Sequence, residues 1–229
     1  MASIQFGILL FPFQLSDCAM PLDIIFSSTK RALASMEGAG FPAGISERGI
    51  PEIQFHYIAA TSLDPVRLYT AGFTTLPTTT VADCPKLDYL LIGGPETSYI
   101  QNLPSEVSRF LQERVTEVTT IFTTCTGAMV LAAAGVLDGI EATTNHGAVP
   151  LAQQLLPKVK WTREKQWVVS EGGKFWTAGG ACAGMDMFAH WVMGKYGVDV
   201  ATYAFAALDY SPRGQDKQLV QLPSVKWTA

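Results

Sequence analysis

The sequence has few of the features that mark secreted or membrane proteins. Its cysteines are far apart, with no Cys-x-x-Cys pair among Cys18, Cys84, Cys125 and Cys182. This spacing predicts neither a disulfide framework nor a zinc site, so we expect a reducing, cytoplasmic compartment. No stretch approaches the ~20 consecutive apolar residues that a membrane-spanning helix needs. The short apolar run at 4–11 has no Lys or Arg before it, so no signal peptide is predicted.

Basic residues are also sparse. The chain has 16 Lys and Arg against 20 Asp and Glu, for a net charge of −4, and no basic run. Nucleic-acid-binding domains usually present a basic face, so this class is not expected. The three histidines show no metal-ligand spacing, and no Gly-x-Gly-x-x-Gly pattern suggests a dinucleotide. The sequence therefore predicts no nucleic acid, no membrane, no metal and no cofactor.

What the chain does have is the composition of a compact α/β protein. Of its 229 residues 48% are hydrophobic and only 16% charged, enough for a full core. Predicted strands and helices alternate along the chain, and this alternation predicts a mostly parallel sheet covered by helices on both faces. No linker or repeat divides the chain, so residues 1–229 are predicted to form one domain. Strands are predicted at 4–11, 53–59, 87–92, 118–123, 167–169 and 174–178, a short hairpin at 69–81, and helices at 21–33, 105–115, 127–135, 184–196 and 200–208.

The most informative stretch is 124–127, Thr-Cys-Thr-Gly, which places one thiol between a buried strand and a buried helix. A residue in such a turn is often strained, and its side chain is lifted clear of the sheet. Free N–H groups at the helix N-terminus favour an anion, so a lowered pKa is expected for the Cys125 thiol. The alternative is an inert buried cysteine. The position favours a nucleophile.

Other candidate residues also follow predicted strands. Ligand sites in parallel sheets lie beyond the carboxyl ends of the strands, so Asp17, the Gly93-Gly94 pair and Cys125 are expected to share one crevice. Asp17 is interpreted as an acid or base beside the thiol, with helix capping as the alternative, and one of the pair should hold a proton. Gly93, Gly94 and Thr126 are candidate N–H donors to an anionic intermediate. Their alternatives are a turn for the glycines and a helix cap for Thr126.

Two further residues keep two interpretations each. His146 is the histidine nearest to the predicted crevice in sequence, and it either binds substrate there or serves as a loop or dimer-contact residue. Cys18 adjoins Asp17 and either lines the crevice or packs in the loop.

Together these segments resemble the DJ-1/PfpI superfamily, and within it the isonitrile hydratase-like branch. The resemblance implies a flavodoxin-like three-layer α/β sandwich of the class I glutamine amidotransferase-like type, usually a homodimer, with an elbow cysteine at 125. The branch has aspartate where many members have glutamate, which Asp17 matches. The segments that carry the resemblance are Gly7-Ile8-Leu9-Leu10-Phe11-Pro12, Asp17 with Pro21, Ala82-Asp83-Cys84-Pro85, Leu87-Asp88, Gly93-Gly94, Cys125-Thr126-Gly127-Ala128, residues 131–139, Ala142-Thr143-Thr144 and Thr177-Ala178-Gly179-Gly180 with Ala183-Gly184-Met185-Asp186.

The chain departs from the family at one position. The family usually reads Ala-Thr-Thr-His-Trp, whereas residues 142–146 read Ala-Thr-Thr-Asn-His, so the imidazole is displaced by one residue. The resemblance implies a cofactor-free lyase that hydrates a small electrophile, an isonitrile, to an N-formamide. One alternative is a glyoxalase III-type conversion of methylglyoxal to lactate, which usually relies on glutamate and histidine. Another is a non-enzymatic redox sensor or stress protein in which Cys125 is oxidised to a sulfinic acid.

Overall fold

The computed structural model describes residues 3–225, in which seven strands form one sheet in the order β10-β11-β7-β6-β1-β2-β5. The pairings within this sheet are parallel except that β10 runs antiparallel to β11. The strands are β1 (Ile4–Leu9), β2 (Ile53–Ala59), β5 (Thr79–Thr80), β6 (Tyr89–Ile92), β7 (Thr120–Thr123), β10 (Trp167–Ser170) and β11 (Phe175–Ala178). The predicted mostly parallel sheet is confirmed.

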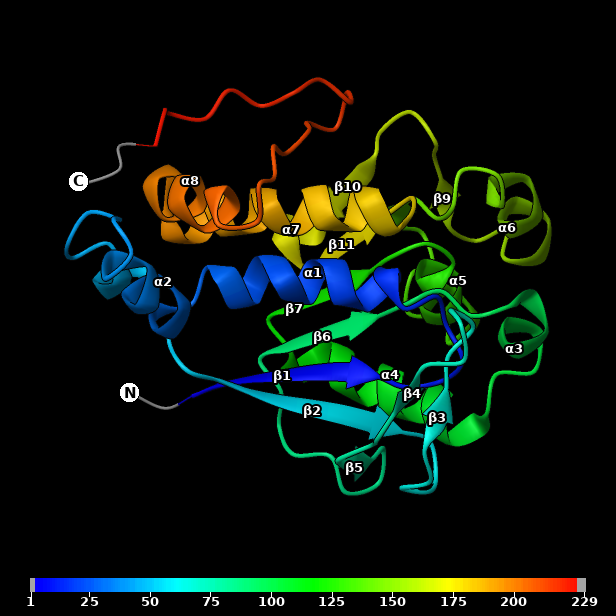
Figure 1. Ribbon diagram of the computed structural model, residues 1–229. Helices are drawn as coiled ribbons and strands as arrows, with labels where there is room; N and C mark the ends of the chain where they lie inside the picture. Colours follow the sequence, from blue (N-terminus) through cyan, green and yellow to red (C-terminus); the bar gives the residue numbers. More distant parts are fainter. Residues whose placement is uncertain (1–2, 226–229) are drawn as a thin grey trace.

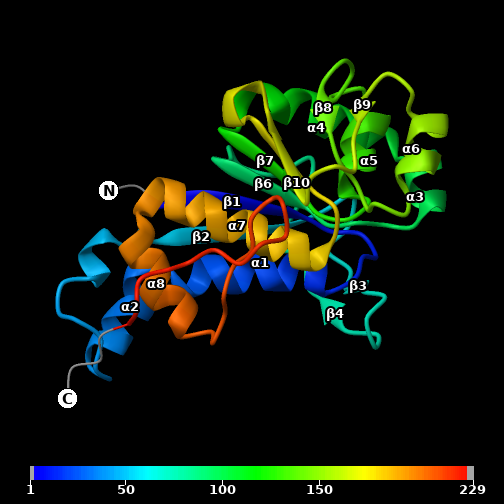
Figure 2. The same ribbon diagram turned by 90° about the horizontal axis from the view of Figure 1, so that it is seen from above.

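Helices cover both faces of this sheet. One layer holds α1 (Ser16–Ser27), α7 (Ala181–Tyr196) and α8 (Val198–Ala206), and the other holds α4 (Ser105–Glu117) and α5 (Gly127–Ala133) (Figures 1 and 2). Every residue of β6 and β7 is buried, as expected for central strands between two helical layers. The flavodoxin-like three-layer sandwich is therefore confirmed. The remaining elements are α2 (Lys30–Glu37), α3 (Thr97–Gln101), α6 (Val149–Leu155), the 3-10 turns Ser46–Arg48 and Glu171–Gly173, and the small pairs β3 (Val66–Arg67) with β4 (Thr74–Thr75) and β8 (Glu141–Ala142) with β9 (Lys160–Trp161).

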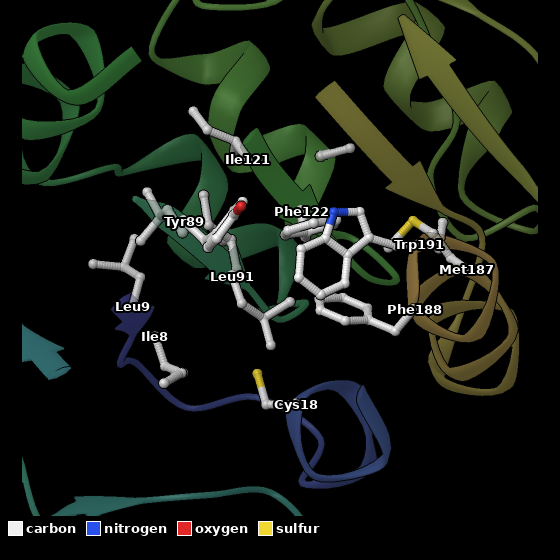
Figure 3. Close-up of a cluster of buried hydrophobic side chains, with 14 of the residues drawn as sticks. Ile8, Leu9, Cys18, Tyr89, Leu91, Ile121, Phe122, Met187, Phe188 and Trp191 are labelled. Carbon is white, nitrogen blue, oxygen red and sulfur yellow. The ribbon is translucent and has the colours of Figure 1, made fainter. Parts of the chain in front are cut away.

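An aromatic cluster joins the central strands to α7 (Figure 3). The ring of Phe122 on β7 lies 4.4 Å from that of Phe188 on α7, and Trp191 meets Phe122 edge-on at 5.6 Å. Offset and edge-on ring pairs add about 0.5–1.5 kcal/mol beyond the area that they bury. The cluster therefore holds β7 firmly in the core, immediately before Cys125.

The first helix differs from its prediction. It begins at Ser16 rather than near Pro21, which lies inside α1, and the segment predicted as one helix is two. The second helix, α2, starts after Thr29, whose hydroxyl accepts the Ala32 N–H at 3.2 Å. Asp17 thus lies in the first turn of α1 and not in a loop.

The segment predicted as one hairpin at 69–81 also has two parts. The hairpin β3–β4 begins earlier, at Val66, while β5 joins the edge of the main sheet beside β2. The hairpin lies beside the first turn of α1 in both views (Figures 1 and 2). Two hydrogen bonds anchor it there: the Tyr69 N–H donates to the Phe13 carbonyl at 3.1 Å, and the Leu15 N–H donates to the Thr70 hydroxyl at 3.0 Å.

None of the helices described within residues 3–225 is long and apolar enough to cross a membrane. The single domain predicted over 1–229 includes residues 1–2 and 226–229, which lie outside the described residues, and it stays a prediction.

Candidate active site

Cys125 occupies a strained turn between β7 and α5. Its φ is 53°, in the left-handed region that a residue with a side chain enters only at an energetic cost. Two groups from the segment after β8 hold this conformation, since the Cys125 carbonyl accepts the Asn145 N–H at 3.2 Å and the Thr144 hydroxyl at 3.0 Å. The strained elbow that the sequence predicts at Cys125 is present.

Glycines allow the turn after β6 to pack directly against this elbow. A Cβ on Gly94 would lie 2.6 Å from the Thr126 nitrogen and 2.8 Å from the Cys125 Cβ. A Cβ on Gly127 would lie 2.3 Å from the Ile92 carbonyl oxygen. Both positions are closed to any side chain, so the close approach of the two turns depends on glycine at each.

Asp17 reaches the elbow from α1. Its side chain is 1% exposed, and Oδ2 accepts the Gly94 N–H at 3.0 Å. Proline at 21 has no N–H to donate to the Asp17 carbonyl four residues earlier, so that carbonyl accepts the Thr124 hydroxyl at 2.9 Å instead. A proline inside the helix thus frees a backbone acceptor that ties α1 to the residue before the thiol.

The electrostatics of the pair follow from burial. Burial raises the pKa of Asp17 from 3.8 to about 6, against the opposing effect of the Gly94 N–H. Burial also raises the pKa of the Cys125 thiol, as does the nearby Asp17 charge, while the Thr126 N–H and the Asn145 amide lower it. The expected lowering of the thiol pKa is therefore wrong, because desolvation outweighs the donors at the start of a seven-residue helix. At neutral pH the thiol keeps its proton and Asp17 is mostly ionised.

The thiol opens on a cleft of about 600 Å³ that Asp17 also lines. Such a volume is in the range of small-molecule sites. The Tyr69 hydroxyl, from the β3–β4 hairpin, accepts the Glu96 N–H at 3.3 Å and so links the two sides of the rim. The other lining residues are Gln14, Gly94, Pro95, Thr97, Ser98 and Thr126. A mostly apolar groove adjoins the cleft, shares Gln14 and Tyr69 with it, and is completed by Leu15, Ser16, Ala19, Met20 and Thr70.

The structure brings four predicted site residues together: Asp17, Gly94, Cys125 and Thr126. The Gly94 N–H is already bound by Asp17, so it does not stand free to hold an anionic intermediate as predicted. Gly93 turns its N–H toward the Cys18 thiol in the core, on the other side of the turn. The Thr126 N–H contacts the Cys125 sulfur. Of the predicted N–H donors, Thr126 is therefore the one aimed at the thiol.

His146 is not brought to the thiol. Its Nε2 lies 3.0 Å from the Lys165 carbonyl oxygen, and its ring packs against Gly179, where a Cβ would lie 2.8 Å away. Sequence reasoning missed Asn145, whose Nδ2 lies 3.7 Å from the Cys125 sulfur. The available signal was its position directly after Thr143-Thr144, where the family keeps histidine. No motif points to Tyr69 or Gln14 on the cleft rim. Within residues 3–225 no group of three or more His, Cys, Asp or Glu side chains could hold a metal ion.

Comparisons with known proteins agree with this fold and identify the family. The pattern of the DJ-1/PfpI family matches residues 51–193. The chain is 32% identical to an isonitrile hydratase from Pseudomonas putida over 212 residues, covering 92% of this chain and 80% of the relative.

Solved structures show the same fold. A ThiJ/PfpI family protein from Pseudomonas syringae superposes with a TM-score of 0.71 at 24% identity, over 93% of this chain and 77% of that one. DJ-1beta from Drosophila melanogaster superposes with a TM-score of 0.67 at 16% identity, over 92% of this chain and all of that one. From the family match and the 32% identity, the chain belongs to the DJ-1/PfpI family, in its isonitrile hydratase-like branch.

Proposed function

We propose that this protein is a hydro-lyase that adds water to an isonitrile to give an N-formamide, with Cys125 as nucleophile. One observation carries the proposal: the strained Cys125 opens on a small-molecule cleft beside a buried aspartate whose pKa is about 6. The similarity to an isonitrile hydratase supports the choice of substrate. No step of the reaction calls for a cofactor.

In the first step Asp17 acts as a base. With a pKa of about 6 it is mostly ionised at neutral pH, and a base with a pKa near the working pH is the most effective. It takes the thiol proton, and the sulfur attacks the terminal isonitrile carbon, forming a C–S bond as one C–N π bond breaks. The proton then passes from Asp17 to that carbon, which gives a thioimidate, Cys–S–CH=N–R.

The second step releases the product. Asp17 takes a proton from water as the water oxygen attacks the thioimidate carbon, and it returns that proton to the substrate nitrogen. The C–S bond then breaks, the hydroxyl becomes the formyl C=O, and its proton restores the thiol. The sum is R–NC plus H₂O giving R–NH–CHO. The Gly94 N–H stabilises the Asp17 carboxylate between transfers, and the Thr126 N–H stabilises charge at the sulfur.

The cleft also has a place for the organic substituent of the isonitrile. The apolar groove that shares Gln14 and Tyr69 with the cleft adds the side chains of Leu15, Ala19 and Met20 beside the thiol site. A linear isonitrile group bound at Cys125 would direct its substituent away from the sulfur and along the cleft.

Two alternatives are less well supported. Conversion of methylglyoxal to lactate usually uses a histidine near the thiol, and here His146 is bound to the Lys165 carbonyl. A redox sensor works best with a thiol of lowered pKa, and burial raises that of Cys125. Homodimer assembly, from the family resemblance, and a cytoplasmic location, from the cysteine spacing, remain part of the proposal; light scattering on the purified protein tests the first.

The test is turnover of a simple alkyl and a simple aryl isonitrile, followed by the appearance of the formamide. Wild-type protein is expected to form it, whereas Cys125→Ala and Cys125→Ser are expected to be inactive. Equal formamide yields from wild type and Cys125→Ala would contradict the proposal. Parallel assays for lactate from methylglyoxal, and mass spectrometry after mild peroxide, identify which alternative holds if no formamide forms.

A further inference from the structure

Asn145 makes three contacts at the elbow, two of them with Cys125 itself. Its backbone N–H donates to the Cys125 carbonyl at 3.2 Å, and its side-chain Nδ2 lies 3.7 Å from the sulfur. Its Oδ1 accepts the Gly147 N–H at 3.1 Å. The residue is half-buried, so both ends of its amide are fixed beside the elbow.

These contacts decide which end of the amide faces the sulfur. A carboxamide has an acceptor oxygen and a donor nitrogen, and its orientation is assigned from its partners. The Gly147 N–H can pair only with the oxygen, which leaves the NH₂ group to face Cys125. The side chain can therefore donate to the sulfur, but it has no basic nitrogen to take a proton from it.

We propose that Asn145 is a positioning residue for the Cys125 nucleophile. Its amide aims the sulfur at the cleft and donates a hydrogen bond to it as negative charge forms. Asp17, and not Asn145, moves the proton. The inference rests on the proposed function in taking this thiol as the reactive group, and it assigns the site a second residue. A neighbouring imidazole would instead share the proton with the thiol. With asparagine at this position the two roles fall to different residues: Asn145 orients the sulfur and stabilises its charge, and Asp17 transfers the proton.

The separation has a measurable consequence for the thiol. A hydrogen bond to a charged group contributes more than one to a neutral group, so a donor at the sulfur favours thiolate over thiol. Removing the donor by Asn145→Ala should raise the thiol pKa. Asn145→Asp keeps the size of the side chain and the acceptor for Gly147, yet replaces the donor with a negative charge, so it should raise the pKa further.

The experiment measures the rate of Cys125 alkylation by iodoacetamide against pH, followed by mass spectrometry of the peptide that contains Cys125. We expect Asn145→Ala to slow alkylation at pH 7.5 by about three- to tenfold and to move the profile to higher pH. Asn145→Asp should slow it more. The matched control is Asn102→Ala: Asn102 is exposed, lies outside the cleft, and donates its amide to the Ser98 carbonyl at 2.8 Å. Its profile should superpose on that of wild type.

The outcomes separate this inference from the proposed function. Profiles of both Asn145 variants that superpose on wild type would overturn it, as would a lower thiol pKa in Asn145→Asp. Thermal unfolding identifies a merely structural role, which would lower stability and leave the midpoint of the alkylation profile unchanged. Failure of the proposed function gives a different result, since formamide would not form even in wild type while the alkylation profiles still differed.

Discussion

Two thiols, those of Cys18 and Cys125, lie near Asp17 in different environments. Cys18 follows Asp17 on α1, is 3% exposed and points into the core toward Leu91 (Figure 3). Cys125 is half-buried and opens on the cleft. Burial and the Asp17 charge raise the pKa of both thiols. The two residues thus share an acidic neighbour and a direction of pKa shift, and differ in access and backbone geometry.

The two thiols differ in the direction in which the backbone points them. Consecutive residues on a helix point about 100° apart, so Asp17 faces the elbow while Cys18 faces the sheet. Cys125 instead projects from a strained turn with φ of 53°, which lifts its sulfur out of the sheet layer. Access to the cleft and a neighbouring carboxylate, rather than a low resting pKa, are the features on which the proposal of Cys125 as the nucleophile rests.

The strongest way to test this comparison is to remove the base. Asp17→Asn keeps an oxygen for the Gly94 N–H but cannot take a proton, so isonitrile turnover should fall about 10²- to 10⁴-fold. The matched control is Asp23→Asn, an exposed position on the same helix, which should leave kcat/KM unchanged. Turnover by Asp17→Asn within a few-fold of wild type would show that Asp17 is not the base.

The same substitution should stabilise the protein. The pKa of Asp17 is raised by folding, so its contribution to stability is complete below pH 3.8 and is lost as pH rises through about 6. A shift from 3.8 to about 6 corresponds to at most about 3 kcal/mol. Urea unfolding at pH 8 should show Asp17→Asn more stable than wild type by up to this amount, with the difference disappearing by pH 4. If Asp17→Asn were less stable than wild type at pH 8, burial of the ionised carboxylate would not destabilise the fold.

Alkylation should distinguish the two thiols directly. Iodoacetamide should modify Cys125 more than about 100-fold faster than Cys18, because Cys18 becomes accessible only when the core opens. The exposed Cys182 serves as the internal reference for an accessible cysteine. Comparable rates at Cys18 and Cys125 would remove access as the distinguishing factor.

The smallest effect is expected from Cys18 itself. Cys18→Ala removes one buried sulfur and should lower the free energy of unfolding by about 1–2 kcal/mol. Because the thiol faces the core, kcat/KM for an isonitrile should stay within about twofold of wild type. A large loss of turnover with normal stability would place Cys18 in the reaction.

Much of this site is visible in local sequence. The buried strand before Cys125 and the helix after it follow from runs of neighbouring residues. So do Gly94 and Gly127, which let the turn after β6 pack against the elbow. The start of α1 did not follow, because Pro21 suggests a first turn when read alone. In the structure it is tolerated five residues into the helix, since the Asp17 carbonyl finds a donor in Thr124, which is 107 residues away in sequence.

The sequence by itself determined the strands of the central sheet, the cysteine at the elbow and the glycines at 94 and 127, because each depends on short-range pattern and on which residue can adopt a given turn. Only the tertiary structure decided that the thiol rather than Asp17 holds the proton at neutral pH, and that Asn145 rather than His146 reaches the sulfur. Desolvation depends on everything packed around a group, and the direction of a side chain in a loop depends on its partners in space. Neither can be read from residues in order along the chain.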